Sequence, residues 1–203
     1  MALRLLLVRH GETIWNHQRR CQGFSDIPLS AAGEEQAKNL ARALKPVPLD
    51  AVISSDLVRA KRTAEFIAEP HQIMIKTDAR FRELNQGQLE GKNITEMLAD
   101  HPALLKQWME NPADTVMPEG ESLSKLQARA SSAINEIAAN YPDHTVAVVS
   151  HNLCILTIVC KIINLNLNDF RRLRIDNASV SEIEFSSRGP ILNRINDIHH
   201  LKT

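Results

Sequence analysis

Two hydrophobic patterns alternate along the chain, one typical of buried strands and one of amphipathic helices. Short apolar runs occupy residues 3–9, 50–54 and 145–150, and the last is rich in β-branched side chains, as in buried parallel strands. Over 31–44 and 56–68, apolar residues instead recur three or four positions apart, which predicts helices with one buried face. Strands that alternate with helices favour an α/β fold, a three-layer α/β/α sandwich with a mainly parallel central sheet.

Polar residues indicate where several helices begin. Ser30, Asp56 and Ser122 each precede a helical pattern, and their side chains are of the kinds that cap helix N-termini. The remaining predicted elements are a strand at 72–76, an almost wholly apolar helix at 153–163, and a hairpin of 179–186 and 191–196 joined through Gly189-Pro190.

Residues 85–120 are less regular than the rest. Three prolines interrupt this stretch, and only short helical pieces are expected, at 94–99 and 104–109. We interpret the segment as a small helical cap inserted over the site of a single domain that covers residues 1–203. Trp108 lies in it, where it could either line the inner face of the cap or pack against other side chains.

Composition narrows the class of protein. The 203 residues are 43% hydrophobic, enough for one well-buried domain, and 24 basic residues balance 24 acidic ones. A zero net charge does not favour a nucleic-acid or membrane-surface partner, so any basic character must be local. Cys21, Cys154 and Cys160 form no CxxC pair, and together with the lack of a signal-peptide pattern or a long apolar span they favour a cytoplasmic protein. The sequence is compatible with a homodimer and does not fix the oligomeric state.

Candidate chemistry gathers where the predicted strands end. Arg9 and His10 follow the strand at 3–9, His151 follows the strand at 145–150, and Arg59 falls in the first turn of a helix that follows a third strand. Ligands of open α/β sheets bind at the carboxyl ends of the strands, and helix N-termini attract anions. A histidine there can attack phosphorus while arginines hold the phosphate oxygens.

The ordered set of motifs resembles the histidine phosphatase superfamily, the phosphoglycerate-mutase-like fold. The matching stretches are Leu7 to Thr13 with Asn16, Gln22-Gly23, Pro28 to Ser30 with Gly33, Ser54 to Thr63, Glu83 to Gly91, Pro118 to Ser122, and Ser150-His151. They cover most of the chain in the expected order.

The resemblance implies a role for each matching residue. His10 would be the nucleophile that forms a phosphohistidine, and Glu83 would protonate the leaving oxygen and then assist water. Such an acid must keep its proton near neutral pH, which calls for burial. The phosphate-holding residues would be Arg9, Arg59 and His151, helped by Asn16, with Gln22, Gly23 and Asn152 as further phosphate-binding positions. Asn152 stands where the family usually has glycine, and asparagine tolerates a left-handed backbone better than most residues.

Several alternatives accompany these assignments. Arg62 competes with Arg59 and Glu90 with Glu83, and Gln22-Gly23 could be a plain polar loop. The expected activity is metal-independent and cofactor-free hydrolysis of a small phosphorylated metabolite, with α-ribazole 5'-phosphate as one candidate. The segment between Glu83 and His151 is shorter than the insertion that mutases of this family carry. A cofactor-dependent phosphoglycerate mutase and a non-catalytic phosphate-ligand binding protein are the rival functions.

Overall fold

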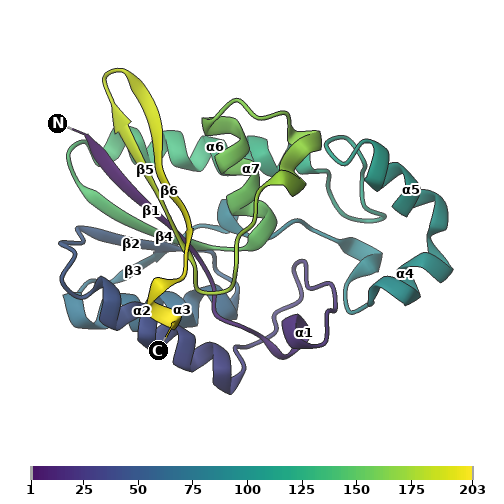
Figure 1. The fold of residues 1–203 in the computed structure, drawn as a ribbon, viewed down its shortest axis with the longest axis horizontal. Coiled ribbons are helices and arrows are strands. Elements are labelled where there is room, and N and C mark those ends of the chain that lie inside the picture. Colours follow the sequence, from purple (N-terminus) through teal and green to yellow (C-terminus); the bar gives the residue numbers. More distant parts are fainter. Residues whose placement is uncertain (1, 203) are drawn as a thin grey trace.

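A six-stranded mixed sheet forms the centre of the structure, a computed structural model that describes residues 2–202 (Figure 1). The strands are β1 (Leu3–Arg9), β2 (Ala51–Ser54), β3 (Ile75–Thr77), β4 (Thr145–Ser150), β5 (Val180–Ser186) and β6 (Gly189–Asp197), in the order β3-β2-β4-β1-β5-β6. Neighbours from β3 to β1 run parallel, whereas β5 and β6 are antiparallel to the strands beside them. The predicted fold class is confirmed, with the antiparallel hairpin at one edge.

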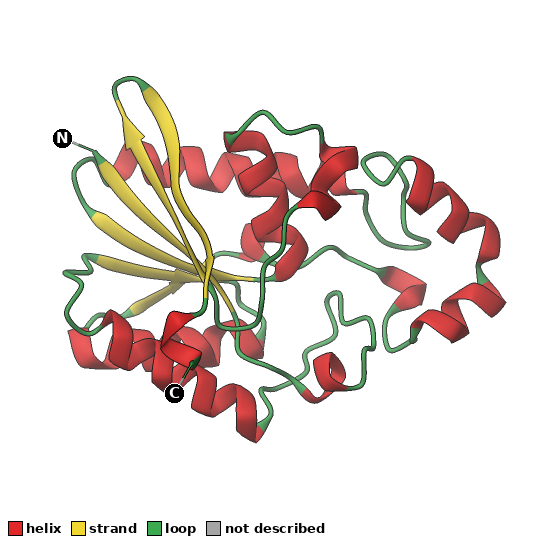
Figure 2. Cartoon of the chain, viewed as in Figure 1, coloured by secondary structure: helices red, strands yellow, loops and turns green. Residues whose placement is uncertain are grey.

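Helices cover both faces of the sheet, as Figure 2 shows. Because side chains alternate along a strand, Leu5 and Leu7 of β1 enter one hydrophobic core while Leu6 and Val8 enter the other. The first core contains α6 (Leu123–Asn140) and α7 (Asn152–Ile162), and the second contains α2 (Ala31–Leu44) and α3 (Val58–Ala68). These are the three predicted layers.

The predicted helices and most predicted caps are confirmed. Ser30 accepts a hydrogen bond from the backbone N–H of Gly33 at the start of α2, and Ser122 accepts one from Lys125 at the start of α6. The apolar stripes of both helices are buried. No helix among residues 2–202 is both long and apolar enough to cross a bilayer.

The prediction that Asp56 caps α3 is wrong. Its carboxylate instead accepts hydrogen bonds from the guanidinium of Arg82 at 2.7 and 2.5 Å. The N–H of Val58, the first residue of α3, donates to Oδ1 of Asp26 at 2.6 Å, so a residue distant in sequence supplies the cap.

Two element boundaries also differ from the predictions. The strand expected at 72–76 begins only at Ile75, because Gln72 has a left-handed backbone that ends the preceding turn. Gly189 and Pro190 belong to the start of β6, so the hairpin turns at Ser187 and Arg188.

A small lobe lies beyond the carboxyl ends of β1, β2 and β4 (Figure 1). It contains α4 (Ile94–Asp100) and α5 (Pro102–Glu110), which extend the two predicted short helices, while the four-residue α1 (Ile14–His17) follows β1. Within the described residues neither α4 nor α5 carries a fully buried side chain, so the lobe is thin.

Candidate active site

Strand pairing brings the two candidate histidines together. β1 and β4 pair in register up to Arg9 and Ser150, and the N–H of His10 continues the ladder by donating to the Ser150 carbonyl at 3.0 Å. His10 and His151 therefore leave adjacent strands side by side, with ring centroids 5.1 Å apart. Both rings are buried.

The glycine after His10 is required by close packing. A Cβ on Gly11 would lie 2.3 Å from the carbonyl oxygen of Gly33, and a Cβ on Gly33 would lie 1.9 Å from that of Glu12. The chain after β1 therefore passes directly against the first turn of α2, and any larger residue would push His10 away from the strand end.

His10 has the tautomer that a nucleophile needs. Its Nδ1 lies 2.6 Å from the carbonyl oxygen of Gly11, and because a carbonyl only accepts, Nδ1 carries the proton. Burial holds the pKa of His10 well below its ordinary value of 6.5, and the positive charges of Arg59 and Arg9 lower it further. The ring is therefore neutral at pH 7, and the lone pair on Nε2 is available for attack.

Arg9 and Arg59 supply permanent positive charge beside His10. Burial lowers the pKa of Arg59 to about 10, still well above neutral pH, and it also lowers the pKa of Arg9. A guanidinium keeps its charge under ordinary conditions. Arg9 donates from Nη1 to the Ile175 carbonyl at 2.7 Å, while its Nε is buried without a partner among residues 2–202. A buried donor of this kind suits an anion in the adjacent cavity.

Arg59 is held by a loop and by His151. Its Nη1 and Nη2 each donate to a backbone carbonyl at 2.8 Å, those of Ser25 and Gly23, and its Nε donates to Nδ1 of His151 at 3.2 Å. The guanidinium has five N–H groups, so two remain for a ligand.

His151 is fully buried and packs against the His10 ring. Since Arg59 can only donate, Nδ1 of His151 must accept, and Nε2 then carries the proton toward Oγ of Ser55 at 2.9 Å. Both ring nitrogens are thus occupied by protein partners in the described chain. The structure places His151 against the His10 ring, and its role as a direct phosphate clamp stays a prediction.

Two side-chain amides turn their N–H groups toward the site. Oδ1 of Asn16 accepts hydrogen bonds from Thr13 and from Asn177, and Oε1 of Gln22 accepts one from the Thr13 hydroxyl at 2.9 Å. With both oxygens used in this way, the amide nitrogens of Asn16 and Gln22 are left as donors at a cavity that both residues line.

Gly23 occupies a position that only glycine fits. Its φ is +54°, and an added Cβ would lie 2.1 Å from Oε1 of Glu90. Glu90 in turn accepts hydrogen bonds from the backbone N–H groups of Phe24 and Ser25 and from the Ser25 hydroxyl. Glu90 therefore shapes the loop whose carbonyls hold Arg59.

Glu83 lies at the cavity wall with its carboxylate at the start of α7. It accepts hydrogen bonds from the backbone N–H groups of Leu84 at 2.9 Å, Leu153 at 3.1 Å and Cys154 at 3.3 Å. Glu83 thus replaces the side-chain cap that His151 does not provide to this helix. The side chain is half-buried and lines the cavity, so the expected burial is partial.

These side chains surround a cavity of about 330 Å³. Within residues 2–202 its lining consists of Arg9, His10, Asn16, Arg20, Cys21, Gln22, Gly23, Arg59, Glu83, Gln86, Trp108, Asn152, Leu153 and Phe170. Asn152 has helical backbone as the first residue of α7, so the expected left-handed turn is not needed there.

The sequence predicts only part of one wall of the cavity. Trp108 of α5 and Phe170 pack with ring centroids 5.9 Å apart, and both line the cavity together with Arg20. Trp108 both lines the cavity and packs against another side chain, so it fills both roles that the sequence allows. Phe170 comes from a short 3-10 segment far along the chain, and no motif in the sequence marks it.

A cysteine thiolate or a metal-binding cluster of side chains near His10 could compete with it as the reactive group. Burial raises the pKa of the Cys21 thiol to about 12, and the nearby charges of Glu83 and Glu90 act in the same direction. Cys21 is therefore not a thiolate at neutral pH. Residues 2–202 contain no group of three or more His, Cys, Asp or Glu side chains that could hold a metal ion.

Comparison with known proteins places this site in a family. The sequence model of the histidine phosphatase superfamily (branch 1) matches residues 5–198. The chain is 38% identical to the probable phosphoglycerate mutase GpmB of Escherichia coli O1:K1 over 98% of this chain and 95% of that protein. The Bacillus stearothermophilus YhfR structure superposes with a TM-score of 0.94 at 31% identity, covering 98% of this chain and all of that one. The α-ribazole phosphatase from Shigella flexneri gives 0.87 at 25% identity over 96% of each chain.

Proposed function

The chain belongs to the histidine phosphatase superfamily (branch 1), and on that premise we propose that it hydrolyses phosphomonoesters through a phosphohistidine on His10. The observation that carries the proposal is the environment of His10. Its neutral ring keeps a lone pair on Nε2, and it lies beside the buried Arg59 and the half-buried Arg9, which both retain unused N–H donors. Phosphoryl transfer needs positioning and stabilisation of charge on the phosphoryl oxygens, which such a site supplies.

In the first step, Nε2 of His10 attacks phosphorus and the bond to the leaving oxygen breaks. Nδ1–H stays bonded to the Gly11 carbonyl, which keeps the ring oriented as its charge grows. Arg9, Arg59 and the amide of Asn16 hold the phosphoryl oxygens. Glu83, in its protonated form, gives its proton to the leaving oxygen, and a neutral alcohol departs.

In the second step, water attacks the phosphorus of the phosphohistidine. Glu83, now a carboxylate, takes a proton from that water while the P–N bond breaks and the electron pair returns to Nε2. Inorganic phosphate leaves, and both His10 and Glu83 regain their starting forms. No step requires a metal ion, because the arginines supply the positive charge.

The thin lobe over the cavity supports hydrolysis over mutase activity. A mutase must keep water from its phosphoenzyme, and among the described residues α4 and α5 bury no side chain completely. Mutase activity is the second candidate, because Arg20 adds a third cation at the cavity that could hold a carboxylate and because the GpmB relative bears that name.

Release of inorganic phosphate from p-nitrophenyl phosphate in EDTA is the direct test. We expect turnover in the wild-type protein and none in His10→Ala, while a matched control at an exposed histidine, His144→Ala, keeps full activity. Dependence on added metal, or turnover by His10→Ala, would overturn the mechanism. Absence of turnover on every ester tested would favour a phosphate-ligand binding protein.

The same assay with a panel of phosphate esters identifies which substrate the protein prefers. The wall formed by Trp108 and Phe170 favours a leaving group with a planar or apolar part, which is the reason to include α-ribazole 5'-phosphate beside 3-phosphoglycerate. Transfer of phosphate between the hydroxyls of phosphoglycerate without release to water would identify the mutase instead. We also propose a cytoplasmic location, which the free thiols of Cys21, Cys154 and Cys160 support.

A further inference from the structure

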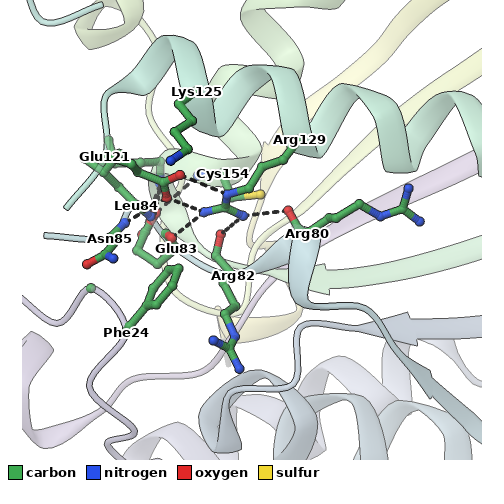
Figure 3. Close-up of polar contacts among 12 residues, drawn as sticks. Phe24, Arg80, Arg82, Glu83, Leu84, Asn85, Glu121, Lys125, Arg129 and Cys154 are labelled. Atoms are coloured by element: carbon green, nitrogen blue, oxygen red, sulfur yellow. Dashed lines mark hydrogen bonds and ion pairs between the residues drawn. The ribbon is translucent and has the colours of Figure 1, made fainter. Parts of the chain in front are cut away.

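Behind Glu83, Arg129 of α6 donates hydrogen bonds to backbone carbonyls of the segment that carries Glu83 (Figure 3). Nη1 of Arg129 donates to the carbonyl oxygens of Arg80 at 2.7 Å and Arg82 at 2.9 Å, and Nη2 donates to that of Glu83 at 2.7 Å. The Arg80 carbonyl belongs to the short 3-10 helix Ala79–Phe81, and the other two belong to the irregular stretch that follows it, where no regular ladder would satisfy them.

Glu121 completes this arrangement. Its carboxylate accepts from Nη2 of Arg129 at 2.6 Å and from Nε at 3.2 Å, so all five N–H groups of the guanidinium are used. The same carboxylate accepts the backbone N–H of Asn85 at 2.9 Å. The side chain of Glu121 is only 6% exposed and that of Arg129 19%, so this ion pair is largely shielded from water.

Glu83 is consequently held from two directions. Arg129 fixes the backbone on its α6 side, and the N–H groups of Leu153 and Cys154 receive its carboxylate on the α7 side. A glutamate has three rotatable side-chain bonds, so its backbone must be fixed if the carboxyl group is to meet a leaving oxygen.

We propose that Arg129, paired with Glu121, is the positioning residue for Glu83, and that its contribution appears in the proton transfer to the leaving group. The inference rests on the proposed role of Glu83 as proton donor. Arg129 touches no reacting atom. Replacing it should therefore lower kcat most for substrates whose leaving group needs a proton, and it should change substrate binding little.

Leaving-group dependence tests this directly. We compare kcat and KM for 2,4-dinitrophenyl phosphate, whose leaving group departs without a proton, with those for phenyl phosphate, whose leaving group needs one. Positioned general acids contribute roughly 10²–10⁴-fold. We therefore expect Arg129→Met and Arg129→Lys to reduce kcat for phenyl phosphate at least about tenfold more than for the dinitrophenyl ester, with KM little changed.

Three further variants sharpen the result. Glu83→Gln should show the same dependence with a larger loss, and adding Arg129→Met to it should remove little more. Arg80→Met is the matched control, because its guanidinium pairs with Asp78 and Glu136 on the far side of the same segment and should leave the leaving-group dependence unaltered.

The outcomes separate the two proposals. If Glu83→Gln affects both esters equally, the role of Glu83 in the proposed function fails. If Glu83→Gln discriminates but Arg129→Lys and Glu121→Gln lower both esters by the same factor, Arg129 is only a structural residue and this inference fails. Because those two variants keep a polar group at each position, either of them decides the question if Arg129→Met does not fold.

Discussion

Nε of Arg59 donates a hydrogen bond to Nδ1 of His151 over 3.2 Å, and this contact sets the tautomer of a completely buried histidine. The same guanidinium binds two loop carbonyls, so a single side chain ties α3, the loop at 23–25 and the end of β4 together. Arg59 therefore shapes the site in addition to providing charge.

Arg59→Lys should lower kcat/KM even though the positive charge is retained. An ammonium group cannot reproduce the planar fork that reaches His151, Gly23 and Ser25 together, and each charged hydrogen bond lost costs about 1.5–3 kcal/mol. We expect a loss of at least about tenfold in steady-state hydrolysis of p-nitrophenyl phosphate.

Arg62→Lys is the control for that change. Arg62 lies on the same helix, but it pairs with Glu34 and Glu65 at the surface, where such pairs contribute about 0–1 kcal/mol. Its kcat/KM should stay close to the wild-type value, and a larger loss in Arg62→Lys than in Arg59→Lys would show that the wrong arginine has been assigned.

Inorganic phosphate should stabilise the folded protein through Arg9. The buried Nε of Arg9 has no partner in residues 2–202, and a bound phosphate would satisfy it. A ligand at one hundred times its Kd adds about 2.7 kcal/mol to the free energy of unfolding. Thermal unfolding should therefore show Tm rising by several degrees with phosphate, and Arg9→Met should lose most of that rise. A rise of equal size with chloride at matched ionic strength would indicate a salt effect instead.

Stability should fall as the pH drops below about 6.5. Burial is the main reason that the pKa values of His10 and His151 lie well below 6.5, so the folded protein keeps both rings neutral while the unfolded chain takes up protons. The unfolded state then binds more protons, and each histidine lowers the free energy of unfolding by up to about 1.4 kcal/mol per pH unit until its folded pKa is reached.

His10→Asn tests this pH dependence. Urea unfolding followed between about pH 7.5 and 5, above the range where most carboxylates titrate, should give a shallower slope for this variant than for the wild type. His144→Asn, at an exposed position, should keep the wild-type slope. Identical slopes for wild type and His10→Asn would contradict the buried neutral state.

The sequence predicts the position of site residues that directly follow strands, because the carboxyl ends of parallel strands lie along one edge of the sheet. Arg9, His10 and Arg59 line the cavity as that rule predicts, whereas His151 packs against the His10 ring. The register of β1 against β4 then fixes the distance between the two histidines.

The parts that were not predicted depend on contacts between distant segments. The local position of Asp56 predicts a helix cap, but its carboxylate binds Arg82 and Asp26 caps the helix instead. Phe170 and Arg129 likewise act through neighbours far away in the chain, where spacing gives no information.

The place of β1 inside the sheet has a consequence for how the protein folds. His10 is synthesised early, yet within residues 2–202 the partners of β1 are residues 145–150 and 180–185, so the first strand waits for the last third of the chain. Such a high contact order slows folding and leaves an apolar strand exposed on the nascent polypeptide until then. The pairing that sets His10 beside His151 can therefore form only after residue 150 has been synthesised.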